Sequence, residues 1–548
     1  MTQMVFKSKF DDVQIPEKPF SEFFFEHFDR YGDEVALVEA VSGQTYTFRQ
    51  MKQLCERVAS GMLRKGWKKG DVVCIFSYNS PEYCIAFHAL AAAGLTITTC
   101  NPAYTVEETQ HQLRDSGARA VFTVKEYLPK VKEICEALTP HCRHVWLMDQ
   151  DATQADIAGF NSLNGELFKE LLDDDGSVFC NRPKNINPKQ DVLVIPYSSG
   201  TTGLAKGVML THYNLIANLC QLKPSNLLRL DYKHDSLIAI LPFFHIYGMV
   251  VIMSLALYQG AKVVSMKKFE PNSFLAAVQK YRVTVLPLVP PIVLFLCKSP
   301  LVKDYDLSSV REIFSGAAPL GKEQAEEVTA KLGINCLRQG YGMTELSPTS
   351  HFPPRDAGLR HGSGGMTLPN TECMIVDTET GQSLSVGQDG EVLVRGPQVM
   401  KGYLNNEKAT AETIKKDGWL CTGDIGHLDE DGHLFITDRL KELIKCKGFQ
   451  VPPAQLESIL LTHPAIQECA VVGKPDDRAG ELPKAYVMLR QGHVTSALEI
   501  QQYLAEKVAP YKRLSGGVEF VSEIPKTASG KILRRVLKQK ELEASKTK

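Results

Sequence analysis

The chain has 548 residues, more than one hydrophobic core usually organises, so its length predicts at least two domains. Hydrophobic residues make up 44% of it and charged residues 23%, which is the composition of an ordinary soluble globular protein. Its formal net charge of −1 provides no electrostatic basis for binding nucleic acid or an anionic membrane. Neither is therefore an expected partner.

The cysteines and the two termini indicate a reducing compartment. The 14 Cys are scattered singly, without a C-x-x-C pair, so they predict free thiols rather than a zinc site. Residues 1–10 hold no apolar segment of a secretory signal. The most apolar long stretch, 283–297, is interrupted by prolines and is too short to span a bilayer. Because the chain ends in Ser-Lys-Thr-Lys and not Ser-Lys-Leu, we expect a cytoplasmic protein.

Residues 35–150 alternate between predicted strands and helices. One strand is followed by a helix that Ser80 caps and Pro81 opens. Thr105 and Glu108 have the spacing of a capping box, which predicts the start of another helix. The resulting β-α-β-α-β order predicts a parallel sheet covered by helices.

A loop rich in glycine and hydroxyl groups follows the polar stretch 150–190, which itself predicts a solvated linker. The runs 191–196 and 208–210 predict two strands, and the loop between them reads Tyr-Ser-Ser-Gly-Thr-Thr-Gly-Leu-Ala-Lys-Gly. Glycines let backbone N–H groups turn inward, hydroxyls add donors, and a lysine adds positive charge, which together suit a polyphosphate. It is not a Walker A motif, because no Ser or Thr follows Lys206 and Gly207. By composition alone, a turn without a ligand is an equal alternative.

A histidine lies where a predicted strand leads into a buried segment. Residues 235–241 predict the strand, and residues 250–257 are apolar all round, which predicts a core helix. His245 lies between them, and α/β proteins place ligand sites at such strand ends. A histidine in an aromatic cluster is usually structural, but this position makes a role in a pocket at least equally expected.

Two later strands end in loops that contain glycine. These loops are Gly316-Ala317-Ala318-Pro319-Leu320 and Gly340-Tyr341-Gly342-Met343-Thr344-Glu345. Such loops let an aromatic base or a phosphate approach the backbone. Glu345 is a hard carboxylate that suits Mg²⁺ when phosphates supply the other oxygens, and a solvated glutamate is the alternative.

The last third of the chain changes pattern. Short predicted strands indicate a small β-subdomain over about 362–437. A charged junction at Asp438 then precedes a compact α+β pattern, so we place the domain boundary there, with domains at 1–437 and 438–548. Lys531 lies on an expected exposed turn before a basic helix.

These motifs occur in the order found in one family. The segments concerned are 198–206, Phe244-His245-Ile246-Tyr247, 315–319, 339–345, Tyr403, 418–424, 438–441, 447–453 and 529–531. In this order they resemble the core motifs of the adenylate-forming, or AMP-binding, superfamily of acyl-CoA synthetases, firefly luciferases and peptide-synthetase adenylation domains. The likeness extends over both expected domains and is in particular to 4-coumarate–CoA ligases and their luciferase relatives.

The resemblance implies an α/β fold and a two-step ligation. A large N-terminal domain of layered mixed sheets would carry a small, mobile α+β C-terminal domain. With ATP, Mg²⁺ and coenzyme A, a carboxylate attacks the α-phosphate to give acyl-AMP and pyrophosphate, and the coenzyme A thiol then displaces AMP. Both steps need charge neutralisation, in-line positioning and exclusion of water.

The resemblance also implies roles for individual residues. It gives catalytic roles to His245, Thr344, Lys447 and Lys531, and a Mg²⁺ ligand at Glu345. Nucleotide and coenzyme contacts fall to Ser198, Ser199, Gly200, Thr201, Thr202, Gly203, Lys206, Gly316, Ala317, Ala318, Pro319, Gln339, Gly340, Tyr341, Gly342, Thr344, Asp424, Arg439, Lys441, Lys447, Gly448, Gln450 and Lys531.

Some of these contacts are implied in more detail. Residues 198–206 would hold the β- and γ-phosphates, residues 316–319 and Tyr341 would sandwich the adenine, and Thr344 would contact the α-phosphate. Asp424 would accept hydrogen bonds from the ribose hydroxyls, near Arg439. Lys531 would bridge the carboxylate and the α-phosphate during adenylation.

The same resemblance implies an acid pocket and a hinge. The pocket would be lined by His245, Tyr247, Gly316, Gly340 and Pro348, which suggests an aromatic or medium-chain acid. Asp438 matches the hinge about which the C-terminal domain rotates between half-reactions, withdrawing Lys531 and bringing Lys447 to the site.

Other functions share the motifs in whole or in part. A luciferase would use the same adenylate with O₂ to emit light, and it has every ATP motif. An adenylation enzyme would charge a carrier protein, although no carrier segment follows Lys531. A non-catalytic nucleotide-binding protein is disfavoured, because Lys206, Glu345, Asp424 and Lys531 are all present. We therefore expect an acid–CoA ligase first and a luciferase second.

Overall fold

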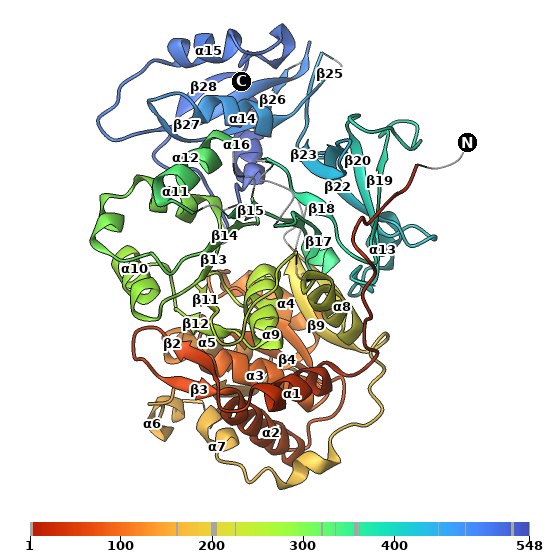
Figure 1. The fold of residues 1–548 in the computed structure, drawn as a ribbon, viewed down its shortest axis with the longest axis vertical. Coiled ribbons are helices and arrows are strands. Elements are labelled where there is room, and N and C mark those ends of the chain that lie inside the picture. Colours follow the sequence, from red (N-terminus) through yellow and green to blue (C-terminus); the bar gives the residue numbers. More distant parts are fainter. Residues whose placement is uncertain are drawn as a thin grey trace.

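The computed structural model describes residues 4–160, 163–198, 205–224, 226–318, 320, 322–334, 336–355, 360, 362–447, 449–476, 478–527 and 531–546. Over these ranges the chain forms four β-sheets with helices packed against them, which is the predicted α/β class. The C-terminal segment lies above the other sheets in the view of Figure 1.

The first sheet contains the predicted parallel region, in the strand order β21-β10-β9-β5-β4-β6-β7-β8. Its parallel strands are β4 Val72–Phe76, β5 Thr96–Thr99, β6 Ala118–Thr123, β7 His144–Leu147, β8 Asn164–Leu167 and β9 Val192–Ser198. Antiparallel strands β10 Lys206–Thr211 and β21 Gly402–Tyr403 complete the edge beyond β9. The β-α-β-α-β prediction is therefore confirmed.

The helices of this region are α1 Phe20–Tyr31, α2 Phe48–Arg64, α3 Pro81–Ala92, α4 Val106–Ser116 and α5 Leu128–Ala137. The two whose starts the sequence predicts, α3 and α4, begin at the predicted positions. The Oγ of Ser80 accepts a hydrogen bond from Tyr83 N at 3.1 Å. Thr105 and Glu108 each bond the other's backbone N–H, so the capping box at the start of α4 is present.

The prediction of a solvated linker at 150–190 is wrong in part. This stretch holds α6 Gln154–Ile157, β8, α7 Phe168–Leu172 and the 3₁₀ turn Ser177–Asn181. β8 pairs with β7 at the edge of the first sheet, and α7 packs on α2 through the buried side chains of Phe168 and Leu171. Ile157, Phe160, Leu163 and Leu167 are buried as well, so scattered apolar side chains fix an otherwise polar segment.

The second sheet has the strand order β15-β14-β13-β11-β12-β2-β3. Its strands are β2 Val35–Glu39, β3 Thr45–Thr47, β11 Ser236–Ala239, β12 Lys262–Ser265, β13 Val285–Leu288, β14 Glu312–Ser315 and β15 Leu337–Gln339. The helices in this part of the chain are α8 His212–Leu222, α9 Leu255–Gln259, α10 Pro271–Lys280, α11 Pro290–Lys298 and α12 Lys322–Leu332. All strands except β3 run parallel, so their carboxyl ends meet at one edge.

The apolar segment after His245 is helical, but its first part is a π-helix, Tyr247–Ser254, which continues into α9. All its residues are buried. A Cβ on Gly248 would lie 2.2 Å from the carbonyl oxygen of Pro242. Only glycine permits this close approach, which brings the helix directly onto the strand end that carries His245.

The third sheet has the strand order β1-β19-β20-β22-β23-β18-β17-β16 and is antiparallel. Its strands are β1 Phe6–Lys7, β16 Tyr341–Gly342, β17 Thr349–Phe352, β18 Gly365–Thr367, β19 Glu372–Val376, β20 Gly390–Arg395, β22 Leu420–Leu428 and β23 His433–Arg439. Helix α13 Glu407–Thr413 lies beside it. Strands β18, β19, β20, β22 and β23 begin within the stretch 362–437 for which the sequence predicts short strands, whereas β1, β16 and β17 come from outside it.

The fourth sheet belongs to the C-terminal segment. Strands β24 Ile444–Cys446, β25 Phe449–Val451, β26 Ile466–Asp476, β27 Gly480–Leu489 and β28 Gly517–Phe520 form it. Helices α14 Pro453–Leu461, α15 Ala497–Ala505 and α16 Arg534–Lys546 accompany it. Leu456, Val471, Val487 and Ile500 belong to a hydrophobic cluster of this segment alone, so it has its own core.

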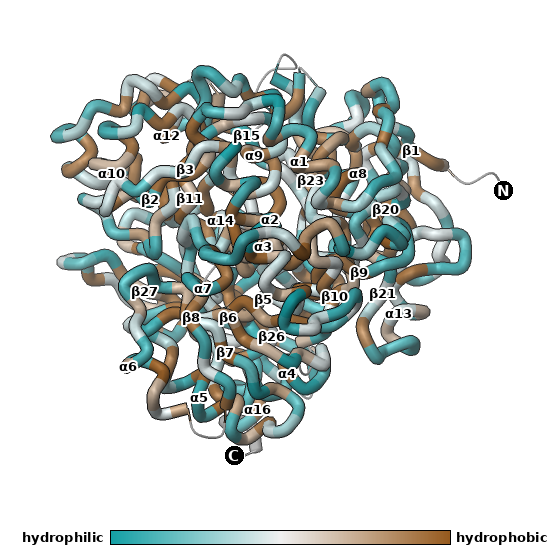
Figure 2. Tube along the Cα trace, turned by 90° about the horizontal axis from the view of Figure 1, so that it is seen from below, coloured by the Kyte–Doolittle hydropathy of each residue, from teal (hydrophilic) through white to brown (hydrophobic). Residues whose placement is uncertain are grey.

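Hydrophobic stretches of chain lie mainly in the interior around β5, β6 and β9, whereas hydrophilic stretches predominate at the periphery (Figure 2). This distribution reflects burial of apolar surface as the main driving force for folding. None of the described helices is both long enough and apolar enough to cross a membrane.

Candidate active site

A cavity of about 810 Å³ lies where the first three sheets meet the C-terminal segment. Its walls are strand ends and loops from regions far apart in the chain. Most of the described residues that the sequence assigns to the site line it: Ser198, Lys206, His245, Tyr247, Gly316, Ala317, Gly340, Tyr341, Gly342, Thr344, Glu345, Pro348, Arg439, Lys441 and Lys531. The fold therefore gathers most of the predicted constellation in one place.

The remaining predicted residues fall into two groups. Ala318, Gln339, Asp424, Asp438, Lys447 and Gln450 are described but do not line the cavity. Ser199, Gly200, Thr201, Thr202, Gly203, Pro319 and Gly448 lie outside the described residues. In the glycine-rich loop, Ser198 and Lys206 are therefore the predicted residues whose positions are known, and they are partners across β9 and β10.

Glu345 is held in place by two hydroxyl groups. The Oγ of Ser198 donates to its Oε1 at 3.0 Å, and the hydroxyl of Tyr403 donates to the same oxygen at 2.8 Å. Its backbone carbonyl accepts from Met400 N at 2.9 Å, and the residue is 5% exposed. The carboxylate is thus fixed in orientation at the wall of the cavity.

Lys206 completes this polar end of the cavity. Its ammonium lies over the ring of Tyr403, 4.5 Å from the centroid, which is a cation–π contact. Tyr403 therefore joins Lys206 to Glu345. The sequence places Tyr403 in a motif without giving it a role, because the contact joins β10, β21 and the loop after β16 and is visible only in the fold.

Glu345 is the carboxylate at this end of the cavity that could bind the expected Mg²⁺. In the described part of the chain, no cluster of three or more His, Cys, Asp or Glu side chains is arranged to hold a metal. One hard carboxylate does fit Mg²⁺, which is usually bound by one or two carboxylates together with substrate phosphates. The donor set of the chain therefore fits a metal that arrives with a polyphosphate, and it does not fit a metal held by protein alone.

Tyr341, Asp424 and Arg439 form a second polar group. The hydroxyl of Tyr341 donates to Asp424 Oδ2 at 2.7 Å, and Arg439 Nε lies 3.1 Å from Asp424 Oδ1. Burial, followed by the charge of Asp424, raises the pKa of Tyr341. Asp424 lies behind the cavity wall. A ribose hydroxyl that bound Asp424 would donate to a carboxylate oxygen that Tyr341 or Arg439 already contacts.

A neighbouring carboxylate, Glu391, supports this group and was not predicted. Its Oε1 accepts from Gly423 N at 3.1 Å, which fixes the backbone next to Asp424. Burial raises the pKa of Glu391. No local motif marks it, because its role depends on the pairing of β20 with β22.

The loop after β14, which is predicted to contact adenine, is held in an uncommon backbone conformation. Ala317 has a φ of 66°, a left-handed conformation that is uncommon for a residue with a side chain. The carboxamide of Gln339 holds the loop, accepting from Leu320 N at 2.6 Å and donating to Leu320 O at 3.3 Å. Gln339 thus positions the loop predicted to contact adenine, and does not itself face the cavity.

His245 and Tyr247 form the wall predicted for the acid. Burial, and then the charge of Lys531, lower the pKa of His245 to about 4, so the imidazole is neutral at pH 7. Its Nδ1 accepts from Tyr247 N at 3.3 Å, which assigns the ring proton to Nε2. The hydroxyl of Tyr247 donates to Phe314 O at 3.2 Å, and burial raises its pKa.

Lys531 reaches the cavity from the C-terminal segment. Its backbone N–H donates to Thr527 Oγ1 at 3.1 Å, and Thr527 N donates back to Lys531 O at 2.8 Å. Burial, and then the charge of Arg439, lower the pKa of Lys531 to about 8. Its ammonium therefore remains charged at neutral pH, although the site disfavours it.

The predicted hinge is part of a buried charged cluster. Asp438, the next-to-last residue of β23, accepts from Ala454 N at 2.9 Å and from Arg439 N at 2.7 Å. Burial raises its pKa to about 6. Arg534 lies nearby and pairs with Glu442 and Glu457, each at 2.5 Å.

Lys447 and Gln450 are exposed on the β24–β25 hairpin. Lys447 has a φ of 52°, in the left-handed region. The two lysines assigned to the two half-reactions thus occupy different environments, with Lys531 in the cavity and Lys447 outside it.

Comparison with known proteins assigns the chain to a family. The family model "AMP-binding enzyme" matches residues 24–404, and the model "AMP-binding enzyme C-terminal domain" matches residues 455–531. The chain belongs to the AMP-binding enzymes. This confirms the family that the sequence motifs predict.

Relatives of this AMP-binding enzyme include 4-coumarate–CoA ligases. The 4-coumarate–CoA ligase 2 of Petroselinum crispum is 42% identical over 544 residues, covering 98% of this chain and 97% of that protein. Among solved structures, the anthranilate CoA ligase AuaEII in complex with anthranoyl-AMP has a TM-score of 0.85 and 26% identity, covering 97% of this chain and 99% of that one. ATP-bound MatB from Rhodopseudomonas palustris has a TM-score of 0.82 and 27% identity, covering 95% and 98%.

Proposed function

We propose that this AMP-binding enzyme is an AMP-forming acid–CoA ligase. It activates a carboxylic acid as acyl-AMP with release of pyrophosphate, and then transfers the acyl group to coenzyme A with release of AMP. The likeness to 4-coumarate–CoA ligases over nearly the whole of both chains supports acid, ATP and coenzyme A as substrates. The neighbours with bound ATP and with bound anthranoyl-AMP support an adenylate route.

The first half-reaction would take place between the polar end of the cavity and Lys531. Lys206, with the backbone of its loop, would bind the terminal phosphates of ATP, and Thr344 would contact the α-phosphate. Lys531 would place its positive charge between the acid and the α-phosphate, where negative charge builds up in the transition state. Pyrophosphate leaves as the carboxylate oxygen bonds to phosphorus, so this step needs no general base.

Magnesium, when bound, would neutralise phosphate charge at this end. Glu345 would hold it from the protein side, with its carboxylate oriented by Ser198 and Tyr403. Those two hydroxyls would act as supports that keep the ligand in place before the nucleotide arrives.

The second half-reaction would require the C-terminal segment to turn. We assign the hinge to Asp438, and the segment that follows has a hydrophobic core of its own, which is what rotation as a rigid body requires. Rotation would withdraw Lys531 and bring Lys447 toward the acyl carbonyl. His245 would orient the acyl group, because a pKa of about 4 is too low for it to take the thiol proton at neutral pH.

The walls of the acid pocket favour an apolar acid. Leu228, Val251, Phe314 and Phe352 line the same cavity as His245. The hydroxyl of Tyr247 is already bonded to the carbonyl of Phe314, so it offers little to a charged tail. We therefore propose an aromatic or medium-chain acid, a class that includes the 4-coumarate named for the relatives.

One observation carries the proposal: Lys531 lines the same cavity as Glu345 and Lys206, although it comes from the other end of the chain. The test is release of AMP with and without coenzyme A, using 4-coumarate, cinnamate, benzoate, hexanoate and octanoate, with the thioester identified by mass spectrometry. We expect turnover that depends on coenzyme A and ends in an acyl-CoA.

Two other outcomes would redirect the proposal. AMP release that is indifferent to coenzyme A, with light from luciferin and O₂, would indicate a luciferase. AMP release that instead depends on an added carrier protein would indicate a carrier-charging enzyme. Either result would overturn the ligase assignment while leaving the adenylation site intact.

A further inference from the structure

A buried charged cluster lies behind the cavity and takes no part in the chemistry above. Glu312, at the start of β14, contacts three arginines. Arg338 Nε donates to its Oε1 at 2.9 Å, while Arg355 Nη2 and Arg311 Nη1 approach its Oε2 at 2.8 Å and 3.0 Å. The side chains of Glu312 and Arg338 are each 1% exposed. Burying two charges is costly, so their further contacts are informative.

Arg338 and Arg355 both bind one loop, residues 226–230. Arg338 donates from Nη1 and Nη2 to Leu227 O, each at 3.1 Å. Arg355 donates from its backbone N–H to Asn226 O at 2.8 Å and from Nη2 to Arg229 O at 3.1 Å. Two arginines fixed by one carboxylate therefore clamp this loop on both sides of Leu228.

Arg338 also holds a second part of the wall. Its guanidinium lies over the ring of Phe352, 4.7 Å from the centroid, and its Nη1 donates to Pro353 O at 2.9 Å. The ring of Phe352 packs so closely on Gly340 that a Cβ there would lie 2.7 Å from it. Phe352 is therefore held between the guanidinium on one side and the glycine on the other.

The two elements that the clamp holds are both part of the cavity wall. Leu228 and Phe352 line the cavity, and both are almost fully buried. We propose that Arg338 and Arg355, joined through Glu312, are positioning residues that fix Leu228 and Phe352 and so set how long an acid the pocket accepts. The inference rests on the proposed acid–CoA ligase, whose acid specificity it explains.

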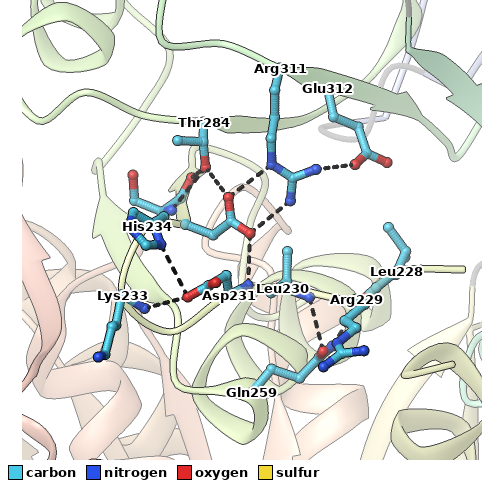
Figure 3. A network of polar contacts seen from close by, with 12 residues as sticks. Leu228, Arg229, Leu230, Asp231, Lys233, His234, Gln259, Thr284, Arg311 and Glu312 are labelled. Carbon is cyan, nitrogen blue, oxygen red and sulfur yellow. Dashed lines mark hydrogen bonds and ion pairs between the residues drawn. The ribbon is translucent and has the colours of Figure 1, made fainter. Parts of the chain in front are cut away.

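The third arginine points away from this wall. Arg311 donates from Nε and Nη2 to the two carboxylate oxygens of Asp235, at 2.9 Å and 2.7 Å, and Thr284 Oγ1 donates to Asp235 at 2.8 Å. Figure 3 shows Arg311 and Glu312 next to each other, with Thr284 near Arg311. None of the partners of Arg311 named here lines the cavity. Arg311 therefore shares the carboxylate of Glu312 but not the contact with the wall.

Another side chain keeps the loop folded if the clamp is weakened. Gln259 donates to Leu228 O at 2.8 Å and accepts from Leu230 N at 3.0 Å, and Figure 3 shows its amide beside this loop. Loss of an arginine contact should thus displace the loop without unfolding it. A displaced wall deepens the apolar pocket and favours acids with additional methylene groups.

The experiment compares Arg338→Lys, Arg355→Lys and the matched control Arg311→Lys. Each keeps a positive charge beside Glu312 and loses the planar fork that reaches several acceptors at once. The readouts are kcat/KM for butanoate, hexanoate, octanoate and decanoate, the KM for ATP, and the melting temperature. Thermal stabilisation by the same acids in the presence of ATP gives a ranking that does not require turnover.

For Arg338→Lys we expect the ratio of kcat/KM for decanoate to that for hexanoate to rise about tenfold, since one methylene is commonly worth 10-fold or more in such a pocket. The side chain of Arg355 is only partly buried. Arg355→Lys should shift the ratio in the same direction, and it tests the inference if Arg338→Lys does not fold. The KM for ATP should not change. Arg311→Lys should lower the melting temperature and leave the acid ranking as in the wild type.

An unchanged acid ranking in both clamp variants, or an equal shift in Arg311→Lys, would overturn the inference and leave Glu312 with a purely structural role. Failure of the proposed function looks different. In that case the wild type forms no acyl-CoA from any acid, whereas the thermal ranking still reports whether the clamp sets the depth of the pocket.

Discussion

The two sides of the cavity are built in different ways. On one side, Glu345 is fixed by Ser198 and Tyr403, and Lys206 lies on the ring of Tyr403. On the other side, Lys531 comes from the C-terminal segment, and burial with the charge of Arg439 lowers its pKa to about 8. The first side is organised before any substrate arrives, whereas the second contributes a charge that the protein tolerates at a cost.

This difference fits a site that serves two reactions. The nucleotide must be held throughout, so its side of the cavity is tied together by hydrogen bonds within the N-terminal region. In the proposed mechanism Lys531 acts in one step only, and it belongs to a segment that has its own core. A tight network of hydrogen bonds around Lys531 would hinder its release from the cavity between the two steps.

The largest effect is expected for Lys531→Ala. Removing a charge that acts on the transition state typically costs about 10²–10³-fold in rate. We expect a loss of this size in acid-dependent exchange of pyrophosphate into ATP, and no loss when purified acyl-AMP reacts with coenzyme A. Lys447→Ala should do the reverse. Equal losses in both half-reactions for either variant would contradict the division between the two sides.

A smaller effect is expected on the fixed side. Glu345→Gln should raise the Mg²⁺ concentration for half-maximal adenylation about 10–100-fold, as loss of a ligand or its support commonly does. Tyr403→Phe removes one of the two hydroxyls that orient Glu345 and should raise it less. Magnesium titrations of pyrophosphate exchange measure both. A Mg²⁺ dependence that neither change alters would show that Glu345 is not the ligand.

The lowered pKa of Lys531 predicts a pH effect with a definite sign. In the proposed mechanism adenylation uses the ammonium form of Lys531, so kcat/KM for the acid should fall as pH rises through about 8. Lys531→Arg, which stays charged, should lose activity at every pH but lack this decline. A pH profile that declines identically in the arginine variant would assign the titration to another group.

The lowered pKa of Lys531 also affects the stability of the fold. Because the folded pKa lies below the ordinary value, the penalty of burying the charge is fully present below pH 8 and disappears as pH rises toward the pKa of the unfolded chain. Lys531→Met should therefore raise the melting temperature at pH 7 and make little difference at pH 10.5. A lower melting temperature at pH 7 would show that the ammonium stabilises the fold.

The smallest effect is expected in the acid pocket. A Cβ on Gly316 would lie 3.0 Å from the ring of Tyr247, which is anchored to the carbonyl of Phe314. Gly316→Ala should lower kcat/KM for bulky acids about 5–10-fold, which corresponds to the low end of the roughly 1–3 kcal/mol that overpacking typically costs. Gly159→Ala is the control, since its nearest neighbour is a lysine tip at 3.5 Å. Equal activity of the two variants would place the acid elsewhere.

Features that depend on local chemistry could be predicted from the sequence. The capping residues Ser80 and Thr105 predict helix starts correctly because the bonds they make lie within three residues. The motif residues Lys206, His245, Glu345 and Lys531 predict a nucleotide site because each side-chain type suits one element of that chemistry, and all four line one cavity.

The sequence pattern was less informative where packing between distant segments decides the outcome. The stretch 150–190 is polar on average, yet Phe168 and Leu171 bind it to α2. The support of Glu345 by Tyr403 and the clamp of Glu312 on Arg338 join residues that are far apart in the chain and carry no joint motif.

The sequence by itself thus determined the class of fold, the family and the chemical types at the site, because these follow from spacing and from the needs of phosphate chemistry. Only the tertiary structure decided which groups face one another: Asp424 behind the wall rather than in it, Lys531 in the cavity and Lys447 outside it. The physical reason is that burial, pKa and orientation depend on neighbours that the chain brings together only when it folds.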